Sequence, residues 1–321
     1  MEEYNTSQAI SDLNINENCL SVKQKQTLDD NGYCLIKISS DEWLKRGIDL
    51  DLISDVIDKL IDQEGTKGGW DHIKNKMIEG KHPEEGAQRL NNLISKHDCF
   101  KKIFTIPEAI VASKYLIKND ISLSQLILRM PLPGKGEQPW HVDWIPRKKK
   151  NDPIRSVLTS LLLDDYTIEN GTTKVVPGSH KLLKQPSDEG YFFQDHPHQK
   201  YIVAPKGSLL IYDVNLWHCG TKNLNGKKRR HLNINYRDRI IWQQINFKKT
   251  LSEDCKNKFS EAEKYLLKIR KKDPDRNEWL FQKRNNFFIK KFINIYWGFL
   301  DRLYNVKKRY FSNNTKSKKV F

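Results

Sequence analysis

The chain has 321 residues and a mass of 37.8 kDa, and 37% of its residues are hydrophobic and 10% aromatic. This composition excludes a collagen-like, low-complexity or wholly disordered chain, and the length suits one large domain with an appendage or two modest domains. The formal net charge of +16 is unevenly placed, because residues 241–321 hold 21 basic and 8 acidic side chains. Residues 1–240 therefore carry a net charge of only +3.

Targeting signals and disulfides are not expected. The first residues, Met1 to Ser7, have neither the basic segment nor the apolar stretch of a secretory signal. No uncharged run is long enough to span a bilayer. The five cysteines are scattered and form no Cys-x-x-Cys pair, which favours a reducing compartment and argues against a structural zinc site. We therefore expect a cytoplasmic protein.

The residues before Asp120 have a mainly helical pattern. Residues 1–22 are polar with few large apolar side chains, and we expect a flexible leader there. The predicted elements that follow are a helix over residues 23–30, a strand over 33–38 after the Asn31-Gly32 turn, a helix over 49–62, and two helices within 87–117 broken near Pro107.

Beyond residue 120 the pattern changes to short β-type runs separated by Pro, Gly, Asn and Asp clusters. Helices followed by strands predict an α+β fold with a mainly β core, an antiparallel sandwich or barrel with supporting N-terminal helices. We expect one domain over residues 23–240 and a basic helical extension over 241–321. The predicted strands are residues 121–130, 156–163, 172–176, 201–203, 208–213 and 230–236.

The first candidate site lies in the segment Gln138-Pro139-Trp140-His141-Val142-Asp143-Trp144. On a strand, residues i and i+2 point to the same face, so His141 and Asp143 would project together. Two histidines and one carboxylate form the facial triad that binds non-haem Fe(II). His218 follows the 208–213 run, 77 residues after His141, and is the candidate third ligand. His-x-Asp alone is a weak signal, because nine histidines make chance matches common.

The surrounding motifs strengthen the interpretation, because the chain resembles the phytanoyl-CoA dioxygenase family of Fe(II)/2-oxoglutarate oxygenases over about residues 28–238. The motifs that carry the resemblance occur in the family's order. They are Asn31-Gly32-Tyr33, Trp140-His141-Val142-Asp143, Asp164-Asp165-Tyr166-Thr167-Ile168-Glu169-Asn170-Gly171, Val176-Pro177-Gly178-Ser179-His180, Gly207 with Trp217-His218, and Arg229-Arg230-His231-Leu232.

This resemblance implies a double-stranded β-helix, a cupin-like jelly roll of two facing sheets. It implies Fe(II) held by His141, Asp143 and His218, with 2-oxoglutarate as cosubstrate and O₂ as oxidant. The expected reaction hydroxylates an aliphatic C–H bond of a small or lipid-linked metabolite and releases succinate and CO₂. The intact Asp143 favours hydroxylation, since a halogenating relative needs that carboxylate replaced.

The distal carboxylate of 2-oxoglutarate needs a cation, and a guanidinium offers a matching bidentate fork. In the family this arginine lies about eleven residues beyond the distal histidine, where Arg229 stands. The adjacent Arg230 would point to the other face of a strand. The run from Lys227 to Arg230 is also compatible with a solvated turn, but the strand that follows it favours Arg229 as the anchor.

Further candidates follow from strand alternation. If Arg229 faces the cavity, then His231, Asn233 and Asn235 do so too, as substrate or cosubstrate contacts or as a hydrogen-bond ladder near the site. Gln125 and Arg129 share one face of the 121–130 strand and are candidate partners of 2-oxoglutarate or substrate. Ser160 occupies a position at which members of the family line the cosubstrate pocket, and Trp144 is a candidate wall of the substrate cavity.

The basic tail suggests a second role. Aromatic and aliphatic side chains recur at helical spacing between residues 278 and 310, among lysines and arginines. Such a helix fits peripheral contact with an anionic membrane, or docking on the barrel or on a dimer partner. The alternative function is thus a catalytically silent jelly-roll module that binds a membrane or partner. No nucleic acid is expected, since no recognisable module accompanies the charge. The oligomeric state is left open.

Overall fold

The computed structural model describes residues 4–65 and 86–273, and its core consists of two antiparallel sheets. The larger sheet has the strand order β1-β7-β4-β9-β3-β2, and the smaller sheet has the order β6-β5-β8. The strands are β1 (Tyr33–Ile36), β2 (Ala87–Leu90), β3 (Ile121–Pro131), β4 (Ser156–Leu162), β5 (Thr173–Val175), β6 (Lys200–Tyr201), β7 (Leu209–Asp213), β8 (His218–Gly220) and β9 (His231–Asp238).

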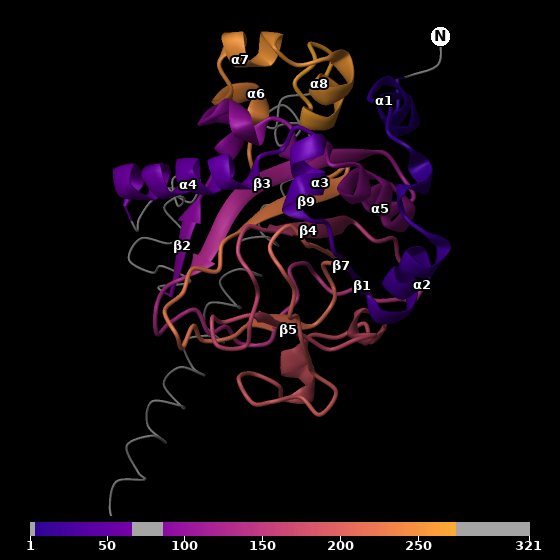
Figure 1. The fold of residues 1–321 in the computed structure, drawn as a ribbon. Coiled ribbons are helices and arrows are strands. Elements are labelled where there is room, and N and C mark those ends of the chain that lie inside the picture. Colours follow the sequence, from indigo (N-terminus) through magenta and orange to yellow (C-terminus); the bar gives the residue numbers. More distant parts are fainter. Residues whose placement is uncertain (1–3, 66–85, 274–321) are drawn as a thin grey trace, which may run out of the picture. The chain divides into compact units, whose positions relative to one another are not determined.

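Helices before and after the strands cover one face of the larger sheet. In Figure 1 helices α3 to α8 lie above the larger sheet and β5 lies below it. The helices are α1 (Thr6–Asp12), α2 (Val22–Asn31), α3 (Ser40–Lys45), α4 (Leu50–Glu64), α5 (Pro107–Ile117), α6 (Phe247–Thr250), α7 (Glu253–Asn257) and α8 (Glu261–Leu267). No helix within the described residues is long and apolar enough to cross a membrane.

Local sequence explains where these helices begin. The Asp49 carboxylate accepts hydrogen bonds from the backbone N–H groups of Asp51 and Leu52 and so caps α4. A Ser21–Gln24 capping box starts α2. Helix α2 ends at Gly32, whose φ of 79° is a left-handed conformation that glycine adopts without penalty. The predicted helices over residues 23–30 and 49–62 are therefore confirmed.

Strand β9 lies at the centre of the larger sheet, between β4 and β3. Its residue Asn233 pairs with Ser160 of β4 on one side and with Ile127 of β3 on the other. Every residue of β9 is buried. Leu232 and Ile234 join the apolar core beneath the helices, whereas a second apolar cluster fills the space between the two sheets. The two faces of the sheet are thus buried against different layers.

The strand predictions agree with the structure from β3 onward, with two differences. The ligand segment is not a full strand: His141 forms an isolated bridge with His218, and Asp143 lies in a bend. Strand β8 is three residues long and was not predicted, because so short a run carries no periodicity. The prediction of a first helix within residues 87–117 is wrong, since β2 and short 3₁₀ turns occupy residues 87–105.

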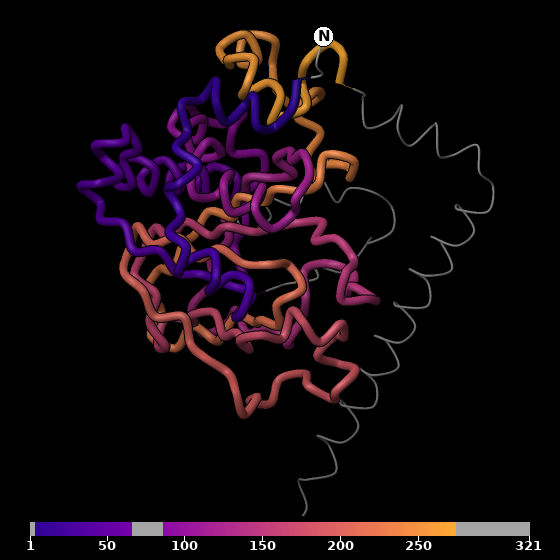
Figure 2. Tube along the Cα trace, turned by 90° about the vertical axis from the view of Figure 1, so that its right-hand side faces the viewer, coloured from indigo at the N-terminus to yellow at the C-terminus, as the bar shows by residue number. Residues whose placement is uncertain are grey.

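The chain ends are more closely packed than the sequence suggests. Within residues 1–22, expected as a flexible leader, α1 buries Ala9 and Ile10 in the core and packs against α8 (Figure 2). Among the described residues, the first compact unit continues to residue 271, beyond the boundary expected at residue 240. Helices α6 to α8 add apolar side chains to the same core. Residues 274–321, with the basic segment 278–310, lie outside the described residues.

Candidate metal and cosubstrate site

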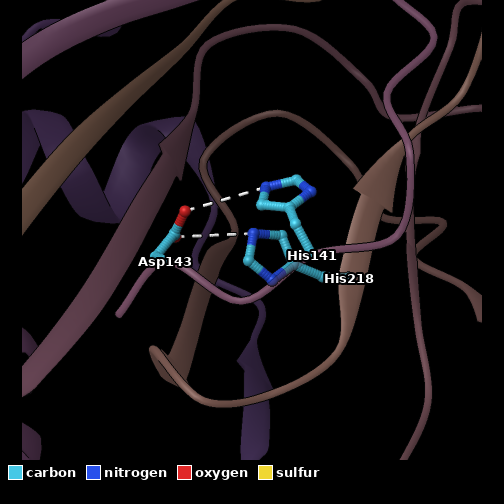
Figure 3. Close-up of side chains that lie close together, drawn as sticks. All are labelled: His141, Asp143 and His218. Carbon is cyan, nitrogen blue, oxygen red and sulfur yellow. Dashed lines mark ion pairs between the residues drawn. The ribbon is translucent and has the colours of Figure 1, made fainter. Parts of the chain in front are cut away.

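Three side chains that are distant in sequence converge beside the smaller sheet (Figure 3). His141 and Asp143 come from the segment after β3, and His218 begins β8. The Asp143 carboxylate lies 3.7 Å from His141 Nε2 and 3.4 Å from His218 Nε2. Within the described part of the chain, these residues form a group whose ligand atoms all lie within 4.8 Å of one another. The arrangement supplies two nitrogen ligands and one oxygen ligand to a common centre.

The backbone fixes how the two histidines face that centre. His141 and His218 exchange both main-chain hydrogen bonds, with N···O distances of 3.0 and 3.1 Å. Each ring is also held through Nδ1, by Pro139 O at 2.8 Å and by Leu216 O at 2.9 Å. Because a carbonyl oxygen only accepts, Nδ1 carries the proton in both rings. Both Nε2 lone pairs are left for a metal ion.

The electrostatics of the triad favour the metal-binding protonation states of His141 and Asp143. Burial, with a contribution from the positive charge of His218, lowers the pKa of His141 to about 4. Burial opposes ionisation of Asp143, but hydrogen bonding and the charges of the two histidines outweigh it and lower its pKa. The pKa of His218 is raised, because the Asp143 carboxylate outweighs the effect of burial. An ionised carboxylate and a neutral His141 are thus ready at neutral pH.

Tyr212 is a residue of this site that the sequence analysis did not identify. Its hydroxyl donates a hydrogen bond of 3.4 Å to Asp143 Oδ2, and its ring centroid lies 5.0 Å from that of His218. Burial, followed by the Asp143 charge, raises the pKa of Tyr212 well above 10, so the hydroxyl stays a donor. Alternation along the predicted 208–213 strand would have placed Tyr212 on the inner face.

Arg229 lies inside the protein, just before β9. Its side chain is fully buried, and its guanidinium carbon lies 4.7 Å from the ring centroid of Tyr166. Arg230 points the other way, where it forms ion pairs of 2.8 Å with Asp164 and 3.0 Å with Asp58. The structure thus separates the two arginines as strand alternation predicts.

His231 follows on the inner face, in an environment rich in positive charge. Its ring lies edge-on to Tyr166 at 5.9 Å, and its Cα pairs with that of Arg129. Burial, followed by the charges of Arg229, Arg129 and Arg89, lowers the pKa of His231 well below 6.5. The ring is therefore neutral. Its buried Nδ1 has no hydrogen-bond partner among residues 4–65 and 86–273.

The two inner asparagines of β9 take part in hydrogen bonds between strands. The Asn233 Oδ1 atom accepts a bond of 2.8 Å from Ser160, and Asn235 donates bonds of 2.8 Å to Ser156 and 3.1 Å to Val157 O. These bonds form a hydrogen-bond ladder of the kind that the sequence allowed, and a substrate or cosubstrate contact by these side chains stays a prediction.

The remaining predicted candidates also lie along this inner face. Gln125 pairs with Asn235 and is half-buried, whereas Arg129 is buried. The positive charge of Arg129 lowers the pKa of both His141 and His231, so it acts on both parts of the site. Trp144 directly follows the ligand Asp143, and the Arg237 guanidinium carbon lies 4.6 Å from the ring centroid of Trp144.

Comparisons with solved structures show the fold. The structure of HygX from Streptomyces hygroscopicus with nickel, 2-oxoglutarate and hygromycin B bound has a TM-score of 0.51 at 14% identity, and the match covers 70% of this chain and 90% of HygX. SnoK, an alpha-ketoglutarate-dependent carbocyclase from nogalamycin biosynthesis, has a TM-score of 0.51 at 17% identity and coverages of 69% and 85%. SnoN, an epimerase from the same biosynthesis, has a TM-score of 0.50 at 14% identity and coverages of 67% and 82%.

Sequence relatives are matched over a shorter stretch. Uncharacterized protein Rv1501 of Mycobacterium tuberculosis is 32% identical over 104 residues, which are 31% of this chain and 35% of that protein. Dioxygenase andF of Emericella variicolor is 27% identical over 103 residues, 30% of this chain and 34% of that protein. The chain thus spans about a third of the length of these relatives. The profile of the phytanoyl-CoA dioxygenase (PhyH) family matches residues 65–231, and the chain belongs to that family.

Proposed function

We propose that this chain is an Fe(II)/2-oxoglutarate-dependent dioxygenase that hydroxylates an aliphatic C–H bond of a small or lipid-linked metabolite, with release of succinate and CO₂. The observation that carries the proposal is the convergence of His141, Asp143 and His218 in a chain of this family. We further propose that the two sheets form a double-stranded β-helix around this site.

The donor set fits Fe(II). Two imidazole nitrogens and one carboxylate oxygen form the triad that leaves coordination positions open for other ligands. The ring orientations are fixed by the carbonyls of Pro139 and Leu216, and the carboxylate is held by Tyr212. Such outer contacts keep metal ligands in place before the ion arrives.

The groups around Arg229 fit a dicarboxylate cosubstrate. A buried guanidinium packed on Tyr166 suits the distal carboxylate of 2-oxoglutarate, because it offers two parallel N–H donors. The buried His231 Nδ1 supplies a further polar atom without a partner among the described residues. A buried polar atom of this kind is costly unless a ligand or water meets it. The structure of HygX with nickel and 2-oxoglutarate bound, which has a similar fold, adds support.

Each residue then has a task. When bound, iron supplies O₂ activation coupled to the oxidation of 2-oxoglutarate. His141 and His218 present their Nε2 atoms, Asp143 stays ionised and contributes negative charge, and Tyr212 holds one carboxylate oxygen by its hydroxyl. Arg229 fixes the cosubstrate orientation from inside the protein, and neutral His231 adds no further positive charge beside it.

The experiment is substrate-stimulated turnover of 2-oxoglutarate in a metabolite screen, with succinate as the readout. We expect succinate that requires Fe(II), and incorporation of ¹⁸O from ¹⁸O₂ into the product. A product that lacks ¹⁸O but has an inverted stereocentre or a new ring would contradict hydroxylation. It would indicate epimerisation or ring formation instead, the reactions for which SnoN and SnoK are named. Absence of Fe(II)-dependent succinate across the screen, together with no uptake of Fe(II), would favour the catalytically silent module instead.

A further inference from the structure

Trp140 and Trp217 each directly precede a histidine of the triad. Because side chains alternate along extended backbone, both indoles point away from the triad to the outer face of the smaller sheet. They are 4% and 1% exposed, and they form a small apolar cluster with Val176 and Cys219. This cluster lies directly behind the two metal-binding histidines and is separate from the core beneath the helices.

A single segment, residues 179–196, holds both tryptophans through four hydrogen bonds. Trp217 donates its backbone N–H to Ser179 Oγ at 2.8 Å and its indole N–H to Lys184 O at 2.9 Å. Trp140 donates its backbone N–H to Phe192 O at 2.7 Å and its indole N–H to Gln194 O at 2.9 Å. The segment lies below β5 in Figure 1. It has only two 3₁₀ turns and no strand of its own.

Aromatic contacts close this segment onto the same pair. The His196 ring lies against the Tyr191 ring, with centroids 4.4 Å apart and the two planes tilted by 50°. It also meets Trp217 at 6.0 Å and Trp140 at 6.4 Å, both edge-on. One ring thus bridges the two tryptophans, and aromatic pairs in such geometries add about 1 kcal/mol each to simple burial.

We infer that residues 179–196 form a clasp whose function is to hold the two histidine ligands at metal-binding distance, with Trp140 and Trp217 as positioning residues. The inference rests on the metal site of the proposed function. His141 forms one bridge pair with His218, and beside it Gln138 and Asp143 each donate one main-chain hydrogen bond, to Gly220 O at 2.9 Å and to Val214 O at 2.8 Å, so the segment has fewer ladder bonds than a full strand. Metal ligands must be placed to within about 0.2 Å. The clasp therefore supplies the order that a longer strand would otherwise provide.

The test is a double variant, Trp140→Phe with Trp217→Phe, which keeps an aromatic ring at each position but removes the indole N–H donor and the volume of the second ring. Co(II) serves as the probe in the absence of 2-oxoglutarate, with its affinity measured by competition against a chromophoric chelator and its coordination followed by visible absorption. We expect at least a tenfold weaker affinity, the scale found when outer contacts of metal ligands are removed. We also expect an altered Co(II) spectrum.

Trp43→Phe is the matched control. Trp43 is likewise fully buried and donates its indole N–H to Gly207 O at 2.7 Å, but it contacts the core beneath the helices. For each hydrogen bond removed, the Trp43→Phe variant should lower the melting temperature by about as much as the double variant does. Its Co(II) affinity and Co(II) spectrum should equal those of the wild type. If the double variant binds Co(II) with the same affinity and spectrum as Trp43→Phe, the clasp is overturned but the metal site is not. Wild-type protein that binds no Co(II) would overturn the metal site and the clasp together.

Discussion

Strand β9 has two faces that are equally buried and chemically opposite. Leu232, Ile234 and Tyr236 have no exposed surface and pack beneath the helices. On the inner face, His231 and Asn233 are only 5% and 8% exposed, yet they are polar and lie beside the site. Burial therefore does not by itself identify the stabilising side of a strand. The apolar face stabilises the fold, whereas binding is the role that we propose for the polar face.

The largest effect is expected when a metal ligand is removed from the polar interior. His141→Ala should abolish Fe(II)-dependent succinate formation, because two of three ligands cannot hold the ion at ordinary concentrations. The His141 side chain is 29% exposed, so the melting temperature of the metal-free protein should change little. His97→Ala, a variant of an exposed histidine, is the control and should keep full turnover. Retained turnover in His141→Ala would show that the metal lies elsewhere.

A change on the apolar face should show the opposite profile. Ile234→Ala removes a fully buried side chain and should lower the free energy of unfolding by about 3 kcal/mol. Folded protein should bind 2-oxoglutarate and Co(II) with wild-type affinity. Urea denaturation and binding isotherms on the same preparation measure both quantities. A loss of 2-oxoglutarate affinity without a loss of stability would break the distinction between the two faces.

Two adjacent arginines allow the sharpest comparison. Arg229→Gln removes the proposed carboxylate anchor and should raise the KM for 2-oxoglutarate about 30-fold, a cost of about 2 kcal/mol for a charge-assisted hydrogen bond. Arg230→Gln removes the ion pairs with Asp164 and Asp58 instead. It should lower stability and leave that KM unchanged. Equal KM values for the two variants would contradict the assignment of Arg229.

The smallest effect concerns the pH dependence of stability. The pKa of His231 lies well below 6.5 in the folded chain, whereas the unfolded chain takes up this proton near pH 6.5. As the pH falls below that value, proton uptake favours the unfolded chain and the free energy of unfolding decreases. When the pH is lowered from 7.5 to 5.5, the free energy of unfolding of His231→Gln should therefore decrease by about 1 kcal/mol less than that of the wild type. Urea denaturation of the metal-free proteins measures both decreases. Identical losses would show that the folded protein also protonates His231.

Much of the site could be predicted from the sequence, because its signals are local. The spacing of His141 and Asp143 and the alternation after Arg229 depend on neighbouring residues, and the structure brings the triad together. Tyr212 could have been found by the same alternation. These inferences need only the period of extended backbone and the chemistry of the side chains.

The features that the sequence did not show depend on contacts between distant residues. The clasp over residues 179–196 has no periodicity, and its hydrogen bonds to Trp140 and Trp217 use backbone carbonyls that every residue possesses. The leader seemed polar, but α1 buries Ala9 and Ile10 only because α8 lies beside it. Strand β2 carries too few residues for its period to be distinguished from a helical one.

The central claim is that the polar interior binds a metal ion and 2-oxoglutarate together, and anaerobic calorimetry tests it directly. We predict that 2-oxoglutarate binds tightly only after Fe(II) has been added, at one ion per chain, and that Asp143→Ala abolishes both events. The coupling is expected because the cosubstrate would bridge the metal and Arg229. Binding of 2-oxoglutarate with equal affinity in the presence and absence of Fe(II), or unchanged Fe(II) uptake by Asp143→Ala, would contradict the account.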